Sequence, residues 1–280
     1  MVELREGTAA TRDFYNLKGW RRRDGMLTDT HLFGWRAGPI CDSLDVQRKE
    51  RVLRAVGQPN PRIAELGCGG TPATFLAQTA AEYTAVDFSS VGLAEAAVAL
   101  RNTGTPFRVV EADITSLPFQ TGAFDVVYSA QAIYHIDTIK GQSEAFREAM
   151  RIVRPGGRAI FIMGNPFPLL FPLRLMRRVL AMTPFIGTVL NRLRAKPPLP
   201  YLPMPLGWMR AELEQWGAVE ITGHAVPSVD FDRLVPETSV LGRAIWRGVR
   251  RLETHHAKLG ARLGCYVLIV VHKPENRAVS

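Results

Sequence analysis

Glycine-rich and acidic sequences follow the first short apolar runs of the chain. Residues 65–71 read ELGCGGT, and Asp87 ends the next apolar run, 20 residues after Gly67. Glycines let the backbone turn sharply, and the helix that begins behind such a turn offers free N–H groups to an anion. A carboxylate at the position of Asp87 can accept hydrogen bonds from both hydroxyls of a ribose. Together these residues indicate a ligand that contains a nucleoside.

Two later sequences also carry polar groups at the ends of short apolar runs. Asp113, in EADI, can accept a hydrogen bond from an adenine amino group, and Ser129 opens the sequence SAQ after the following apolar run. His135 comes a few residues later, and its ordinary pKa of about 6.5 suits a general base near neutral pH. The alternative for His135 is structural, as a hydrogen-bond donor to the loop that follows. We therefore expect an adenosine-containing cofactor, with His135 as the candidate base.

Two common adenosine cofactors do not match the glycine-rich sequence. The fingerprint for NAD would place a third glycine at position 72, where this chain has Pro72, and the GK[ST] sequence that binds the phosphates of ATP is absent.

The elements that must position these groups alternate between strand and helix from Arg62 onward. The predicted strands are RIAELG, YTAVDF, FRVVEAD, FDVVYSA and RAIFIM, then AVEITGHAV and CYVLIVVHK near the end. Helical segments lie between them, including one expected over residues 73–81 and one over 239–259. Such alternation needs crossover connections, which predicts a mostly parallel sheet covered by helices on both faces.

Two segments do not fit the alternation. Residues 1–58 predict an N-terminal helical cap ahead of a main domain at 59–280, and residues 165–206 predict an insertion into that domain. Within the insertion, 166–196 combines arginines with apolar residues. This pattern favours either a lid helix over a substrate pocket or a basic amphipathic helix at a membrane surface.

Composition narrows the class of protein. The 280 residues are 46% hydrophobic and carry a net charge of +9, which excludes a disordered chain and a collagen-like repeat. Three cysteines without a CxxC pair indicate neither a disulfide framework nor a zinc site, and His255 and His256 lack partners at ligand spacing, so we expect no metal. The charged N-terminal sequence is not typical of a secretory signal, and we expect a cytoplasmic protein, with membrane association left open.

The basic residues are unevenly distributed. Residues 149–211 contain ten Lys and Arg and no acid, and a second cluster comprises Arg243, Arg247, Arg250 and Arg251. Such patches favour an anionic partner, although a plain solvated surface is an equal alternative.

The sequences ELGCGGT, AVDFS, VVEADITSLPF, FDVV and RIVRPGG together resemble class I S-adenosylmethionine (SAM)-dependent methyltransferases, within the type 11 group that includes ubiquinone and menaquinone methyltransferases. The resemblance implies a Rossmann-like, doubly wound sheet of seven strands, with the last strand antiparallel. It also implies the cofactor contacts: the methionine part of SAM at Glu65, Gly67 and Gly69, and the adenosine part at Asp87, Phe88, Asp113 and Ile114, with Ser129 at the rim. One departure is Thr71, where the family usually has a third glycine, and it puts SAM binding in doubt.

The implied function is methyl transfer to a small, hydrophobic acceptor such as a quinone, lipid or natural product, with O-methylation favoured. Candidate acceptor contacts are Tyr15 and Trp20, in the N-terminal segment that often covers the site in this family, and His224 at the end of a later strand. The alternatives are an RNA methyltransferase and an inactive module that binds through the SAM fold. The first is disfavoured because the chain reads SAQAIY where an NPPY-type sequence would stand.

Overall fold

The computed structural model describes residues 6–20, 22–23, 26–27, 38–168, 200–227, 231 and 235–275. The N-terminal part comprises helix α1 (Glu6–Phe14), a π-helical turn η1 (Tyr15–Gly19) and two short strands, β1 (Arg22–Arg23) and β2 (Met26–Leu27). Most of the predicted insertion at 165–206, including nearly all of the amphipathic segment at 166–196, lies outside the described residues.

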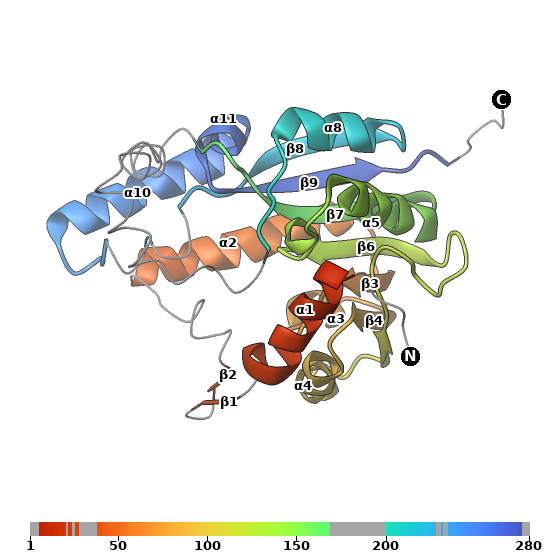
Figure 1. Ribbon diagram of the computed structural model, residues 1–280. Helices are drawn as coiled ribbons and strands as arrows, with labels where there is room; N and C mark the ends of the chain where they lie inside the picture. Colours follow the sequence, from red (N-terminus) through yellow and green to blue (C-terminus); the bar gives the residue numbers. More distant parts are fainter. Residues whose placement is uncertain are drawn as a thin grey trace, which may run out of the picture.

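A seven-stranded sheet forms the centre of the molecule (Figure 1). Its order is β5-β4-β3-β6-β7-β9-β8, and every pairing is parallel except those of β9 with β7 and β8. The strands are β3 (Arg62–Leu66), β4 (Glu82–Asp87), β5 (Phe107–Glu111), β6 (Phe124–Ala130), β7 (Val153–Gly164), β8 (Ala218–Ala225) and β9 (Tyr266–His272). The predicted sheet, with its last strand antiparallel, is confirmed.

Both faces of the inner strands are largely buried, which explains why β3, β4, β6, β7 and β9 are rich in apolar residues. One face packs on α2 (Pro39–Val56), α3 (Thr74–Ala77) and α4 (Ser90–Arg101). The other packs on α5 (Ile139–Ile152) and α8 (Leu206–Glu214). Neighbouring residues of β3 show the alternation: Ile63 faces the first group of helices, whereas Ala64 faces the second.

Two predicted helices differ from those observed. The helix expected over residues 73–81 is only Thr74–Ala77, because the N–H of Ala81 already donates to the carbonyl of Pro61 and leads the chain into β4. The helix expected over 239–259 is divided at His256 into α10 (Val240–His255) and α11 (Ala257–Leu263), since the backbone of His256 leaves the helical conformation.

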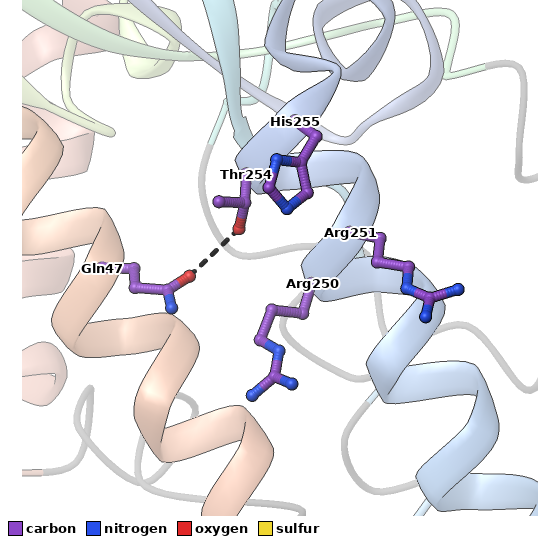
Figure 2. A pocket seen from close by; sticks show the side chains of 5 residues that line it. All are labelled: Gln47, Arg250, Arg251, Thr254 and His255. Atoms are coloured by element: carbon purple, nitrogen blue, oxygen red, sulfur yellow. Dashed lines mark hydrogen bonds between the residues drawn. The ribbon is translucent and has the colours of Figure 1, made fainter.

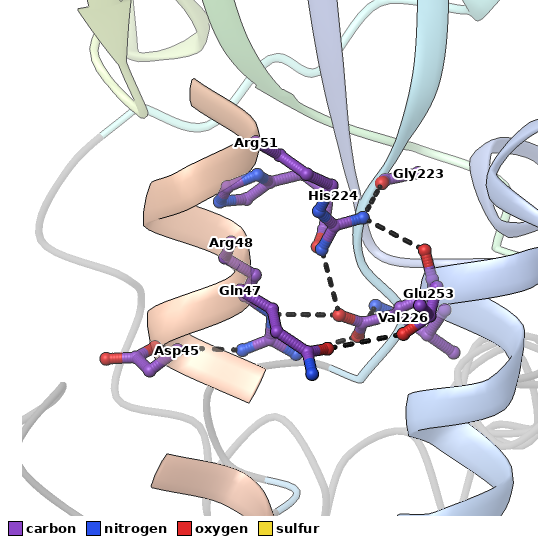
Figure 3. Close-up of polar contacts among 9 residues, drawn as sticks. Asp45, Gln47, Arg48, Arg51, Gly223, His224, Val226 and Glu253 are labelled. Atoms are coloured by element: carbon purple, nitrogen blue, oxygen red, sulfur yellow. Dashed lines mark hydrogen bonds and ion pairs between the residues drawn. The ribbon is translucent and has the colours of Figure 1, made fainter. Parts of the chain in front are cut away.

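A buried cluster of ionic groups joins α2 to α10 and β8 (Figure 3). The guanidinium of Arg48 donates to both carboxylate oxygens of Glu253, at 3.0 and 2.7 Å. Arg51 donates to the same carboxylate at 3.3 Å and to the carbonyls of Gly223 and His224. The Glu253 side chain is only 1% exposed, so water cannot take the place of the arginines as hydrogen-bond partners of its carboxylate.

Replacing Glu253 by Gln should strongly destabilise the fold. The substitution removes the counter-charge that the two largely buried guanidinium groups share and leaves Arg48 only the more distant Asp45, at 3.9 Å. Breaking a buried ion pair in this way typically costs about 3–5 kcal/mol. We expect urea unfolding to show a loss of that order in the free energy of unfolding.

Glu50→Gln provides the matched control, because Glu50 is exposed on α2 and lies 3.9 Å from Arg54. We expect it to change stability by less than about 0.5 kcal/mol. A Glu253 variant as stable as this control would show that the cluster contributes little.

Candidate functional site

The loop after β3 makes the first part of the site. Gly67 and Gly69 have φ angles of 73° and 52°, a region that residues with side chains rarely adopt. The N–H groups of Gly67 and Cys68 both donate to the carbonyl of Val86, at 2.8 and 3.1 Å. Because Val86 belongs to β4, the glycine loop is fixed against the carboxyl ends of two neighbouring strands.

Thr71, which departs from the family pattern, does not distort this loop. Among the described residues only Asn60 and Gln131 combine a side chain with a positive φ, so Thr71 has an ordinary backbone conformation. Its side chain is exposed. Position 71 therefore has no conformational need for glycine.

Two buried carboxyl groups lie beside the glycine loop. Asp87 accepts hydrogen bonds from the N–H groups of Gly69 and Ser89, each at 2.8 Å. Glu65 accepts from the N–H of Ala73 at 3.0 Å and from the hydroxyl of Tyr83 at 2.6 Å. Burial raises the pKa of Glu65 to about 7 and that of Asp87 to about 6.

The electrostatics of this pair suit a cationic ligand. Within the described part of the chain, neither Glu65 nor Asp87 belongs to an ion pair, although both side chains are at most 4% exposed. Two such carboxylates in a low-dielectric site favour a bound positive charge. The sulfonium and ammonium groups of SAM would provide that charge, so the residues present fit this cofactor.

The remaining predicted cofactor residues lie along the same edge of the sheet. The N–H of Ala112 donates to the carbonyl of Asp87 at 3.0 Å, which brings Asp113 and Ile114 beside the end of β4. One carboxylate oxygen of Asp113 accepts from the N–H and hydroxyl of Thr115. Ser129 is 1% exposed, and its hydroxyl donates to the carbonyl of Leu66 at 2.9 Å.

The N-terminal segment is attached at the start of α4, beside this edge. The hydroxyl of Ser89 caps α4 by accepting from the N–H of Gly92, and donates to the amide oxygen of Asn16 at 2.6 Å. Tyr15 packs edge-on against the ring of Phe88, with centroids 6.3 Å apart. Asn16 was not expected from the sequence, because an isolated asparagine carries no pattern.

Trp20 lies directly on the glycine loop. A Cβ atom added to Gly69 would collide with the indole, and one added to Gly70 or Gly92 would lie 2.8 or 2.9 Å from it. Tyr15 stacks on the other side, with ring centroids 5.2 Å apart. The indole is 6% exposed, and its Nε1 is buried without a hydrogen-bond partner among the described residues. Trp20, predicted as an acceptor contact, thus lies on the predicted cofactor surface.

His135 belongs to a short 3₁₀ turn, η3 (Ile133–His135), that adjoins the glycine loop. Ala132, which precedes this turn, packs closely on the loop, because its side chain would collide with a Cβ atom added to Gly67. The Nδ1 atom of His135 lies 2.8 Å from the carbonyl oxygen of Pro200. Since a carbonyl can only accept, Nδ1 carries the proton, and the neutral ring presents Nε2 as an acceptor. Burial lowers the pKa of His135 and favours this neutral form.

The chain returns from the insertion beside His135. Gln142 donates through Nε2 to the carbonyls of Ile136 and Leu202, and the N–H of Leu202 donates to the carbonyl of Tyr134. The Tyr201 hydroxyl lies over Gly164, where β7 ends. Sequence reasoning missed these residues because the contacts join α5 and η3 to a segment about 60 positions later.

Gln131, the last residue of the sequence SAQ, directly follows β6. Its φ of 57° is uncommon for a residue with a side chain, and its N–H donates to the carbonyl of Ile162. Strained backbone of this kind concentrates at functional sites.

His224 is not brought together with these groups. Its strand, β8, is separated from β3 by β6, β7 and β9. The residue is half-buried with its Nδ1 atom out of contact with solvent, and desolvation together with the charges of Arg48 and Arg51 lowers its pKa to about 3. Figure 3 shows it beside Arg51 in the cluster that joins α2 to β8.

Metal-binding clusters and membrane-spanning helices are both absent from the described ranges. No group of three His, Cys, Asp or Glu side chains there is arranged to hold a metal ion. No helix of the described chain has both the length and the apolar character that crossing a membrane requires.

Comparison with known proteins agrees with this geometry. Residues 64–161 match the family described as methyltransferase domain. The chain is 33% identical to the demethylmenaquinone methyltransferase of Thermus thermophilus over 43% of its own length, and 25% identical to the sterol 24-C-methyltransferase ERG6B of Gibberella zeae over 52%. It covers 55% and 39%, respectively, of the lengths of these two relatives.

A solved structure extends the likeness of fold to almost the whole chain. The geranyl diphosphate C-methyltransferase of Streptomyces coelicolor, in complex with Mg²⁺, geranyl diphosphate and S-adenosyl-L-homocysteine, superposes with a TM-score of 0.61. The superposition covers 98% of this chain and 100% of that one, at 13% sequence identity. Residues 64–161 are therefore a SAM-dependent methyltransferase domain, with the strand order and the glycine loop described above.

Proposed function

We propose that the chain transfers the methyl group of SAM to a hydroxyl of a small, largely apolar acceptor. The observation that carries this proposal is the pair of buried carboxyl groups, Glu65 and Asp87, at the glycine loop of a methyltransferase fold. SAM, when bound, supplies a methyl group that is already activated by its positive sulfonium. The protein then has to hold the acceptor in line with that methyl group, and positioning of this kind can contribute about 7–11 kcal/mol.

His135 is proposed to accept the proton of the acceptor hydroxyl. Its Nδ1–H is occupied by the Pro200 carbonyl, which orients the ring and leaves Nε2 to act as the base. The lowered pKa keeps the imidazole neutral at physiological pH. Proton transfer by a positioned group typically contributes about 10²- to 10⁴-fold to the rate.

The proposal of an apolar acceptor is supported by two observations. The relatives named above act on a sterol and on demethylmenaquinone, both largely apolar molecules. The acid-free insertion at 165–206, rich in apolar residues, returns to the fold beside His135 through Pro200. We propose that this insertion closes over the acceptor.

The N-terminal segment is proposed to act as a cap that exchanges with the cofactor. The indole of Trp20 covers Gly69 and Gly70, the surface on which the methionine part of SAM is expected to lie. In this closed arrangement, with the indole on the glycines, the buried Nε1–H of Trp20 has no hydrogen-bond partner among the described residues. An unpaired buried N–H costs about 1–3 kcal/mol. Binding of SAM would move the indole off the glycines.

The first test is binding of SAM and S-adenosylhomocysteine by calorimetry. We expect the wild type to bind both, and Asp87→Asn to bind about 10- to 100-fold more weakly, as the loss of a hydrogen bond to a charged group predicts. The affinity of the wild type should rise between pH 5.5 and pH 8. The reason is that the ionised carboxylates bind the cationic cofactor, and their pKa values are about 6 and 7.

Glu82→Gln is the control, because Glu82 lies at the opposite end of the same strand and is exposed. Equal affinities for the wild type and Asp87→Asn would contradict the assignment of Asp87. A folded wild type that binds neither ligand would favour the inactive-module alternative.

Trp20→Ala should increase the affinity for S-adenosylhomocysteine. If the indole covers the glycines in about nine-tenths of the unliganded molecules, removing it raises the apparent affinity about tenfold. Leu17→Ala, an exposed residue of η1, should leave it unchanged. Weaker binding by Trp20→Ala would show instead that the indole forms a wall of the occupied site.

His135→Gln should lower turnover by about 10²-fold or more while leaving the affinity for SAM unchanged. The assay uses radiolabelled SAM with a panel of quinols, sterols and phenols, and with total RNA as an additional acceptor. The rise of the wild-type rate with pH should be absent in the variant, whereas His256→Gln, at an exposed histidine, should retain it. Unchanged turnover would exclude His135 as the base, and methylation of RNA alone would exclude a small acceptor.

A further inference from the structure

The outer side of α10 exposes apolar residues to solvent. Val240 and Leu241 are 77% and 71% exposed, the highest values among the large hydrophobic residues that the structure describes. Burying apolar side chains again is favourable, and adjacent exposed ones are a feature of interaction surfaces. The opposite side of α10 faces the interior of the protein, where Trp246 packs on Cys41 and Leu44 of α2.

The same helix pair is strongly basic. Across α10 and α11 the only acidic residue is Glu253, whose carboxylate is buried and bound to Arg48 and Arg51. Five basic side chains are exposed, and none has an ion-pair partner within the described part of the chain: Arg247, Arg250, Arg251, Lys258 and Arg262. Val240, Ala244, Arg247 and Arg251 follow the helical repeat, so apolar and basic residues share one side of α10.

A shallow cleft lies between the C-terminal part of α10 and α2. It has a volume of ≈ 260 Å³ and is lined by Gln47, Arg250, Arg251, Thr254 and His255. Figure 2 shows Arg250 extending from α10 toward α2, while the hydroxyl of Thr254 donates to the amide oxygen of Gln47 at 3.2 Å. Guanidinium, imidazole and amide donors around a small cleft suit a phosphate group.

We propose that α10 and α11 form a docking surface for an anionic phospholipid membrane, with Val240 and Leu241 entering the interface and a headgroup phosphate held in the Arg250 cleft. Charge complementarity selects an anionic partner, and the exposed apolar pair selects a lipid over an acidic protein or a nucleic acid. A helix with basic and apolar residues on its free side binds membranes through both contributions. The docking does not depend on methyl transfer.

Vesicle flotation tests the surface directly. The full chain should float with vesicles of phosphatidylglycerol and phosphatidylcholine in equal parts, and not with phosphatidylcholine alone. One basic residue near such a surface contributes about 1 kcal/mol, or roughly fivefold, so the loss of two positive charges alone lowers the partition coefficient about 25-fold. Arg247→Glu with Arg251→Glu also adds two negative charges and should lower it by more than that. Val240→Ser with Leu241→Ser should lower it at least about tenfold while retaining every charge.

The control for the charge is Arg101→Glu with Arg147→Glu, two exposed residues on α4 and α5. This pair makes the same change in net charge elsewhere on the molecule, and should bind within about twofold of the wild type because remote charges are screened. The unfolding midpoints of all the variants should match the wild type, since every substituted side chain is exposed.

Several results would overturn the proposal. They are absence of binding to the anionic vesicles, unchanged binding by the α10 charge variant, or an equal loss in the control pair. Unchanged binding by the serine variant would mean that an acidic macromolecule, rather than lipid, fits this side.

For the cleft, inorganic phosphate should release the wild type from vesicles better than chloride at equal ionic strength, and Arg250→Gln should remove the difference. Equal release by both salts would exclude the cleft as the phosphate site.

Discussion

The two hydrogen bonds that the glycine loop donates to the carbonyl of Val86 hold the proposed site together. They fix the loop after β3 to the end of β4, and the parallel pairing of these strands aligns Glu65 with Ala85 and Leu66 with Val86. Only in this alignment does the N–H of Gly69 reach the carboxylate of Asp87. A one-residue shift in register would turn the side chains of one strand to the opposite face and separate the two carboxyl groups from the loop.

Within the described part of the chain the two carboxyl groups of the site lack a cationic partner, unlike the carboxylate of Glu253. Glu65 and Asp87 have raised pKa values because burial disfavours their charge and no described cation compensates it. Glu253, equally buried, has two arginines as partners. A cationic cofactor would supply Glu65 and Asp87 with the positive counter-charge that Arg48 and Arg51 supply to Glu253. The binding energy of the cofactor would then also stabilise the fold.

The two proposed functions involve different ends of the sheet. The glycine loop, the carboxyl groups and His135 belong to β4, β3 and β6 and the segments that follow them. The basic side of α10 and α11 lies with α2, β8 and β9. This separation allows the proposed membrane contact and the proposed methyl transfer to change independently under mutation.

The sequence by itself determined which segments form the strands and the places of Gly67, Gly69 and Asp87, because apolar runs and turn-forming glycines are local signals. It also indicated that residue 71 departs from the family pattern, but only the backbone angles show that Thr71 causes no strain there. Tertiary structure alone decided that Trp20 lies on the glycines, that Pro200 orients His135, and that His224 joins the arginine cluster. These contacts join segments about 50 to 175 positions apart. Which side chains meet over such separations depends on how complete elements pack, and no local pattern of residues encodes it.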